Sequence, residues 1–463
     1  MSAISSPLSA LPAVQRISSP SSKWVNPLLA AIVVVWLISF IFDYYLSLSI
    51  LTVVGLVAAL VGLRNPTMGL VGIGMLSTLD APARSLLSGG VFRYNTFNYV
   101  LILAIAVGFT YFEKLKDLQS RALQALSLMI ILGVAVTPDV AAGLQHVLNV
   151  VAIFGMLVYF LRARSDPRIL YNTALINGVL AGVGGLVFFL QIDKMPWLTD
   201  DAEGRFMNPN AFSYFPLTGL FSICLAYPSA TRKEQTKLGV LALMTLLSVF
   251  LSGSRGAIIV GMMILLYLIA STHGFSRRLA FIGTIPILAI LTISMFPSLQ
   301  DYAVKRFLKI FDSQVSLKSR TSGRSDVAIV GWGIFLQHPL GVGTGGFPTA
   351  YGQADADEMA FAGIEKQAHS GWVKTLVENG VLGAITLGWY VFSFLFSGQR
   401  GNKRGFTSLG IIVTATIAVS LLGSEFQGKG LWYLACGATV LLNYGMGSTL
   451  PQEGQPLTPT ASS

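Results

Sequence analysis

The chain has 463 residues, of which 53% are hydrophobic and only 11% are charged. Soluble globular proteins carry about 25% charged residues, so this composition excludes a soluble protein and predicts an all-α protein that crosses a membrane many times. The net charge of +10 lies in loops between apolar segments, where it indicates topology and contact with membrane lipids rather than nucleic-acid binding. Cys224 and Cys436 lie in apolar segments and no metal-binding motif is present, so we expect neither a metal nor a cofactor.

The apolar segments predict a polytopic transmembrane helical bundle of roughly 12–14 spans, because a span needs about 20 apolar residues. One group of spans fills residues 27–296, and a second group fills 373–446 after a long polar segment, 297–372. The tails 1–26 and 447–463 are rich in small and polar residues, so we expect them to be disordered and cytoplasmic. The individual segments are 27–42, 46–63, 67–80 (short enough to be re-entrant), 97–112, 122–137, 140–161, 170–191, 211–227, 238–253, 256–271, 279–296, 373–396, 406–424 and 430–446.

Short basic loops set the predicted orientation. Loops rich in Lys and Arg stay on the cytoplasmic side, and these loops are separated from one another by even numbers of spans. The long segment 297–372 then lies on the outer face of the membrane. The cytoplasmic loops are 113–121, 162–168, 231–237, 273–278 and 399–404.

Three arginines fall on the predicted outer face. Arg205 lies in GRFMNPNAF, Arg255 in LSGSRGA and Arg324 in SGRSDVAIVGW. The turn that carries Arg255 is so tight that the arginine must sit at the membrane interface, where a charge is costly unless it has a partner or a function. Guanidinium groups bind phosphate bidentately, so converging arginines would form a diphosphate site without metal. The alternative is that they reach towards lipid headgroups.

The long loop carries further basic residues on the side where the topology rule disfavours them. An anionic ligand on the outer face and contact with headgroups both explain this charge. Within the loop, Arg320 is a further candidate for diphosphate binding, and Asp326 is a candidate ion-pair partner for one of the arginines. The basic residues are Lys305, Arg306, Lys309, Lys318, Arg320 and Arg324.

A glycine-rich segment, HPLGVGTGGF (338–347), follows Arg324. Its backbone N–H groups could cradle a phosphate, but it lacks the Lys-Ser/Thr of a P-loop and lies on the wrong face for ATP, which favours a tight turn. His338 could cap that turn. His146 lies within an apolar span, where a satisfied core histidine is expected, and His273 is expected in a solvated cytoplasmic loop.

The most informative segment is HSGWVKTLVENGVLG, which opens with His369 where the outer loop re-enters the membrane. Histidine can take up a proton near neutral pH, so His369 is a candidate for a catalytic or substrate-orienting role. On a continuous helix, Gly380 and Gly383 share a face with His369 and would let a backbone or a lipid chain come close. Glu378 would face away and is a poor candidate for orienting this histidine.

Taken together and in order, these motifs resemble the O-antigen ligase and polymerase superfamily, a group of bacterial polytopic glycosyltransferases, over roughly residues 200–395. The ligase signature is His, then Asn/Ser/Gln, nine residues, Gly, two residues, then Gly/Thr/Tyr. His369, Ser370, Gly380 and Gly383 match it fully. Related polymerases carry similar segments, so ligase and polymerase both stay open.

The resemblance implies a donor glycan on undecaprenyl diphosphate, transferred outside the inner membrane to a hydroxyl of another glycan or of the lipid A core. It implies a metal-independent inverting enzyme of the GT-C type. Arg255 and Arg324, with Arg205 or Arg320, would stabilise the leaving diphosphate, and His369 would bind the acceptor hydroxyl or orient the diphosphate. Ser370 and Asp326 complete the candidate substrate contacts. The resemblance also admits a chain-length regulator as a partner.

Two other functional classes compete with an enzyme. A transporter or flippase of a lipid-linked or anionic substrate would favour inverted repeats, and none is evident in the sequence. A scaffolding subunit of an envelope assembly would not explain the arginine-bearing turns. The sequence therefore favours a periplasmic-face glycosyltransferase.

Overall fold

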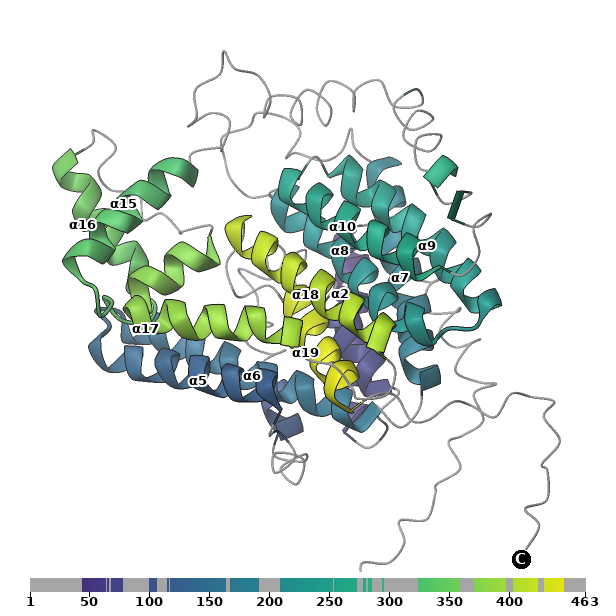
Figure 1. The fold of residues 1–463 in the computed structure, drawn as a ribbon, viewed down its shortest axis with the longest axis horizontal. Coiled ribbons are helices and arrows are strands. Elements are labelled where there is room, and N and C mark those ends of the chain that lie inside the picture. Colours follow the sequence, from purple (N-terminus) through teal and green to yellow (C-terminus); the bar gives the residue numbers. More distant parts are fainter. Residues whose placement is uncertain are drawn as a thin grey trace, which may run out of the picture.

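The computed structural model describes residues 44–63, 68–77, 100–105, 117–163, 167–190, 209–252, 254–272, 324–358, 370–396, 403–423 and 429–444, apart from a few single positions. Within these ranges the protein is all-α, with helices and short 3₁₀ turns and no strand (Figure 1). The predicted fold class, an all-α polytopic membrane protein, is confirmed.

The helices follow the predicted spans closely. The first half has α2 (Tyr44–Val61), a short helix at Met68–Ser77, α5 (Leu118–Gly133), α6 (Val140–Ala163), α7 (Pro167–Leu190), α8 (Pro209–Ala226), α9 (Arg232–Leu251) and α10 (Arg255–Ser271). The second half has α15 (Arg324–Gln337), α16 (Phe347–Glu358), α17 (Gly371–Ser393), α18 (Lys403–Gly423) and α19 (Lys429–Tyr444).

Four of the described helices are long and apolar enough to cross a membrane by themselves. They are Leu118–Val136, Val140–Ala163, Arg232–Leu251 and Gly371–Phe396. The doubtful span 67–80 is a short helix of only Met68–Ser77. The predicted span 27–42, most of the predicted spans 97–112 and 279–296, and the two tails lie outside the described residues. The long loop 297–372 contains two helices, α15 and α16, in its described part.

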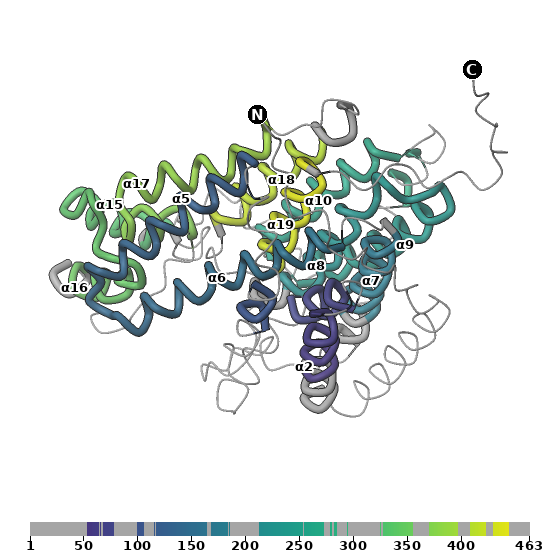
Figure 2. The backbone as a smooth tube through the Cα atoms, turned by 90° about the horizontal axis from the view of Figure 1, so that it is seen from below, coloured from purple at the N-terminus to yellow at the C-terminus, as the bar shows by residue number. Residues whose placement is uncertain are grey.

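Two groups of helices are visible in the structure. Helices α7, α8, α9 and α10 pack side by side, while α5, α6 and α17 run next to one another and extend to α15 and α16 (Figures 1 and 2). Helix α19 joins the two groups because it packs against both α6 and α8. The pocket described in the next section lies where α5, α6, α17 and α19 meet.

Small residues allow the close packing of the first group. A Cβ on Gly219 would lie 2.4 Å from the Cβ of Ala181, and one on Gly185 would lie 2.4 Å from the hydroxyl of Ser248. In a membrane, where lipid is as apolar as the helix surface, such close contacts and inter-helix hydrogen bonds hold helices together. Ser248 provides such a bond by donating to the carbonyl of Gly182 (3.2 Å).

Candidate functional site

Helix α17, which carries the end of the ligase-like signature, is broken at Gly380. This residue has φ 64° and ψ −162°, a backbone conformation that is essentially restricted to glycine. The N–H of Val381 does not continue the helix but donates to the carbonyl of Pro339 (3.1 Å). The expectation of a continuous helix from His369 to Gly383 is therefore wrong, because the glycine-rich turn interrupts it.

The glycine-rich turn completes the hydrogen bonds that the break leaves open. Val342 N–H donates to the carbonyl of Val377 (2.9 Å), and Gly343 N–H donates to the carbonyl of Glu378 (2.9 Å). These two carbonyls would otherwise lose their helical partners. The N–H groups that could have cradled a phosphate are thus used inside the protein, which supports the tight-turn interpretation of this segment.

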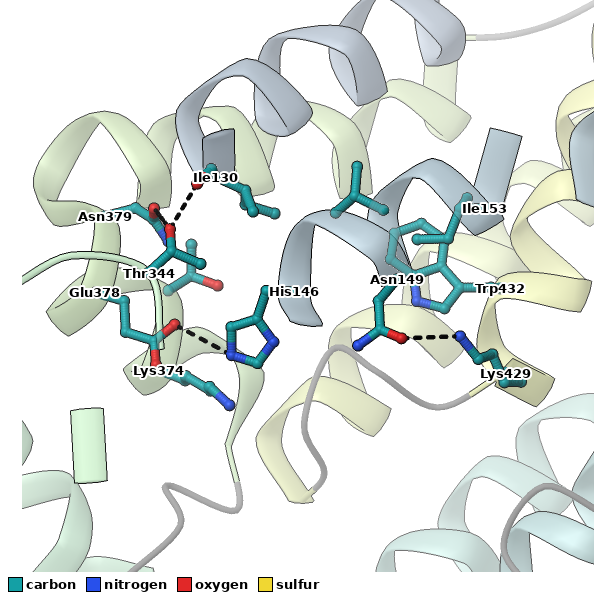
Figure 3. Close-up of a pocket in the computed structure, with 12 residues that line it drawn as sticks. Ile130, His146, Asn149, Ile153, Thr344, Lys374, Glu378, Asn379, Lys429 and Trp432 are labelled. Carbon is teal, nitrogen blue, oxygen red and sulfur yellow. Dashed lines mark hydrogen bonds and ion pairs between the residues drawn. The ribbon is translucent and has the colours of Figure 1, made fainter. Parts of the chain in front are cut away.

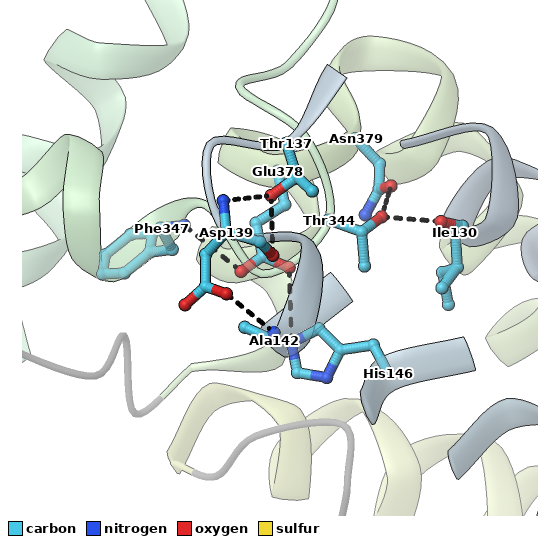
Figure 4. Close-up of polar contacts among 9 residues, drawn as sticks. All are labelled: Ile130, Thr137, Asp139, Ala142, His146, Thr344, Phe347, Glu378 and Asn379. Atoms are coloured by element: carbon cyan, nitrogen blue, oxygen red, sulfur yellow. Dashed lines mark hydrogen bonds and ion pairs between the residues drawn. The ribbon is translucent and has the colours of Figure 1, made fainter. Parts of the chain in front are cut away.

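The same turn also contacts the junction of α5 and α6. Thr344 N–H donates to the carbonyl of Gly133 (3.1 Å), and its hydroxyl lies 2.8 Å from the carbonyl of Ile130 and 2.9 Å from Oδ1 of Asn379 (Figure 4). A hydroxyl has one proton, so it donates to one of these oxygens at a time. Thr344 thereby connects α5 to α17 through the turn, and fixes the geometry of the pocket described below.

The space beside Gly380 is already occupied. A Cβ at this position would lie 2.4 Å from the carbonyl carbon of Leu340 and 2.5 Å from the carbonyl oxygen of Pro339. The expectation that small residues let another backbone come close is confirmed here, since the backbone of the turn takes this place. It leaves no glycine-lined groove for a lipid chain at Gly380.

We expect Gly380→Ala to lower the free energy of unfolding by at least about 2 kcal/mol, because backbone strain adds to the clash with the turn. Gly388→Ala in the same helix is the matched control, since a Cβ there meets nothing within 4 Å. That control should be neutral or stabilising by about 0.5–1 kcal/mol. Thermal unfolding in detergent measures both, and equal stability of the two variants would contradict this account of the break.

A pocket opens between α5, α6, α17 and α19, next to this junction. Its volume of about 40 Å³ has room for a few water molecules or one small polar group. In the predicted orientation, the lining residues of α5, α17 and α19 and most of those of α6 lie in the outer halves of their helices. The lining residues are Ile130, His146, Asn149, Val150, Ile153, Thr344, Lys374, Thr375, Glu378, Asn379, Lys429 and Trp432 (Figure 3).

Charged and polar side chains face each other in this pocket. Nε2 of His146 lies 3.9 Å from Oε2 of Glu378, and Nζ of Lys429 donates to Oδ1 of Asn149 (3.2 Å; Figure 3). The other carboxylate oxygen of Glu378 accepts a weak bond from the N–H of Phe347 (3.4 Å). His146 is half-buried and lies beside a carboxylate of the motif-bearing helix, in keeping with the prediction of a satisfied core histidine.

Most residues of this pocket are not among the predicted site residues, although the sequence holds a signal for them. Lys374 and Glu378 are four residues apart in α17, and His146 and Asn149 are three apart in α6, so each pair shares a helix face. Ionisable residues within apolar spans are costly and therefore mark functional positions. Counting them span by span would have singled out these residues.

Two of the predicted arginines each begin a helix. Arg255 is the first residue of α10 and is half-buried, and Arg324 is the first residue of α15. A cation at a helix N-terminus is electrostatically unfavourable for the helix itself. The same end, with its unpaired N–H groups, is a good place for an anion, so an arginine there strengthens an anion-binding position.

Several predicted site residues lie outside the described part of the structure. These are His369, Arg205 and Arg320; for Arg324 and Asp326 only the helical backbone is described. Ser370 is described and caps α17, since its hydroxyl accepts from the N–H of Val373 (3.5 Å) and donates to the carbonyl of Leu421 in α18 (3.2 Å). Its hydroxyl therefore has a structural role at the start of α17.

Comparison with known families supplies independent evidence. The family model described as O-antigen ligase matches residues 240–388, a segment that includes Arg255, Arg324, the glycine-rich turn and the signature from His369 to Gly383. No curated protein matches the chain. The match supports a membrane protein with a glycosyltransferase-like role in polysaccharide biosynthesis. It confirms, over this segment, the predicted resemblance to the O-antigen ligase and polymerase superfamily.

Proposed function

We propose that the protein is a bacterial inner-membrane glycosyltransferase that moves a glycan from undecaprenyl diphosphate to an acceptor hydroxyl at the periplasmic face. The observation that carries this proposal is the position of Arg255 and Arg324 at the N-termini of two helices within the ligase-like segment. Both guanidinium groups stay charged at any working pH and match the geometry of phosphate oxygens.

In the proposed reaction, the acceptor oxygen attacks the anomeric carbon of the donor sugar while the bond from that carbon to the phosphate oxygen breaks. Negative charge grows on the departing diphosphate, and prepositioned arginines stabilise this charge. Arg255 and Arg324 have this role, with Arg205 or Arg320 as further contacts and Asp326 as an ion-pair partner. Attack from the face opposite the leaving group inverts the anomeric configuration, and no metal is required.

The acceptor hydroxyl loses its proton as the new bond forms, and His369 is the proposed base. It directly precedes Ser370, which caps α17 against the end of α18. A histidine with an unperturbed pKa near 6.5 accepts a proton at neutral pH. The acceptor is either a growing glycan, as in a polymerase, or the lipid A core, as in a ligase; in the polymerase case a chain-length regulator is a candidate partner.

To test this proposal, purified protein in nanodiscs is incubated with an undecaprenyl-diphosphate oligosaccharide and no other acceptor. The products are then separated on a gel. A ladder of longer lipid-linked chains identifies a polymerase. Transfer that starts only after lipid A core is added identifies a ligase. No product in either reaction would contradict the proposal and favour a transporter of the lipid-linked glycan.

The proposed periplasmic location gives a separate prediction. A thiol reagent that cannot cross the membrane should label Ala360→Cys but not Asn402→Cys in intact spheroplasts, because the first lies in the outer loop and the second in a basic cytoplasmic loop. The natural Cys224 and Cys436 are buried, which keeps the background low. The reverse labelling pattern would invert the topology.

A further inference from the structure

Two lysines contribute to the pocket between α6, α17 and α19. The side chain of Lys374 comes from α17 and that of Lys429 from α19; these residues are only 8% and 2% exposed. Figure 3 shows them entering from opposite sides, with His146 and Asn149 of α6 between them. A lysine inside a bundle of membrane helices is costly, and two that converge on one pocket indicate a binding function.

The local backbone adds to the positive potential of the pocket. Lys429 is the first residue of α19, and Lys374 is the fourth residue of α17, so both stand at the positive ends of helix dipoles. Neither lysine stabilises its own helix from this position. Helix N-termini and ammonium groups together are the usual elements of an anion-binding site.

The other lining groups set the size and polarity of the ligand. Asn149 Oδ1 accepts from Lys429 (3.2 Å), and Glu378 lies beside His146 (3.9 Å), so both lysine-bearing helices are held against α6. Among the described lining residues, two lysines stand against one glutamate. The pocket has room for one small group and not for a whole sugar ring.

We propose that this pocket binds an oxyanion, a carboxylate or phosphate group of the substrate, through Lys374 and Lys429. The inference rests on the proposed function and extends it, since it adds a second anion-binding position to the one proposed for Arg255 and Arg324. The oxyanion comes from one of two sources: the diphosphate of the lipid donor, or an acidic group on the glycan. His146 and Asn149 position the ligand between the two lysines.

The test measures binding to the full-length protein in nanodiscs by calorimetry. One probe is farnesyl diphosphate, the second is a disaccharide that contains glucuronate, and the third is its uncharged glucose counterpart. Lys374→Met and Lys429→Met should each weaken the binding of at least one anionic probe by about tenfold or more, because a charge-assisted contact is lost. Lys233→Met, on an exposed lysine of α9, is the matched control and should leave binding unchanged.

Asn149→Asp provides a variant that keeps both lysines. The new carboxylate is nearly isosteric with the amide and lies where Lys429 already donates, so it should hold that lysine in an ion pair. We expect weaker anion binding without loss of thermal stability. This result separates a binding role from a folding role even if a methionine variant fails to fold.

The outcomes assign the source of the oxyanion. Loss of farnesyl diphosphate binding alone indicates the lipid diphosphate, and loss of glucuronate binding alone indicates an acidic glycan. Anion affinities within about twofold of the unmodified protein in all three pocket variants would overturn the proposal, as would an absence of binding to both anionic probes. Binding is measured without an acceptor and does not depend on glycan transfer. A negative transfer assay, which counts against the proposed function, is therefore distinguishable from a lack of anion binding in this pocket.

Discussion

Replacing Arg255 or Arg324 by alanine is expected to lower glycan transfer by at least about 100-fold while the protein still inserts into the membrane. Removing one group that stabilises developing negative charge typically costs about 100- to 1,000-fold in rate. Both arginines begin helices, so an alanine there also removes an unfavourable charge from each helix N-terminus. The loss should therefore appear in activity and not in folding.

Lysine should replace either arginine poorly, because a single ammonium group cannot form the bidentate contact that a guanidinium makes with phosphate. Arg232→Ala is the matched control. Arg232 is also the first residue of its helix, α9, but it is exposed at a helix end that we expect on the cytoplasmic side. Full transfer activity in Arg255→Ala or Arg324→Ala would remove that residue from the proposed site.

Replacing His369 by alanine should reduce transfer by about 100- to 10,000-fold, the usual contribution of a general base. His338→Ala is the control, since His338 is an exposed histidine next to the glycine-rich turn of the same segment. Transfer assays with saturating donor and acceptor measure both variants. If the His338 variant loses as much activity as the His369 variant, the specific role of His369 is wrong.

Ser370→Ala helps to separate catalysis from helix capping at this position. It removes the cap of α17 and the bond to Leu421, which should cost about 1 kcal/mol of stability. If Ser370 contacts the substrate as proposed, its loss also raises the acceptor KM. If its role is only structural, stability falls while KM and kcat stay close to those of the unmodified protein.

The sequence predicted the helices of this protein well, because long apolar segments have few alternatives in a membrane. The predicted spans 140–161 and 373–396 correspond to α6 and to Gly371–Phe396. The predicted span 67–80 is shorter than a full membrane span, and the structure has the short helix Met68–Ser77 within it.

The break at Gly380 could not be predicted from helix periodicity. The Asn379-Gly380 pair is a turn signal, but periodicity alone assigns Gly380 and Gly388, which lies in regular helix, to the same helix. The difference arises from the turn at 339–343, which is distant in the sequence and supplies both the steric contact and the hydrogen bonds. A tertiary contact of this kind overrides local propensity.

The pocket was missed for a related reason. Glu378 was judged only by its position relative to His369 on one helix, and His146 only by the apolar character of its own span. Their pairing joins α6 to α17 across more than two hundred intervening residues, and neither helix reveals it alone. Lys429, at the start of α19, completes a site whose residues come from separate parts of the chain.

The central claim is that this protein breaks the bond between the glycan and the lipid diphosphate instead of moving the intact lipid. The most direct measurement follows an isotope-labelled undecaprenyl-diphosphate oligosaccharide by mass spectrometry, with purified protein, acceptor and a metal chelator. We predict that undecaprenyl diphosphate appears in amounts equal to the glycan transferred, and that Arg255→Ala and His369→Ala prevent its release. A donor that stays intact with every acceptor, while the lipid crosses the bilayer of proteoliposomes, would contradict the account.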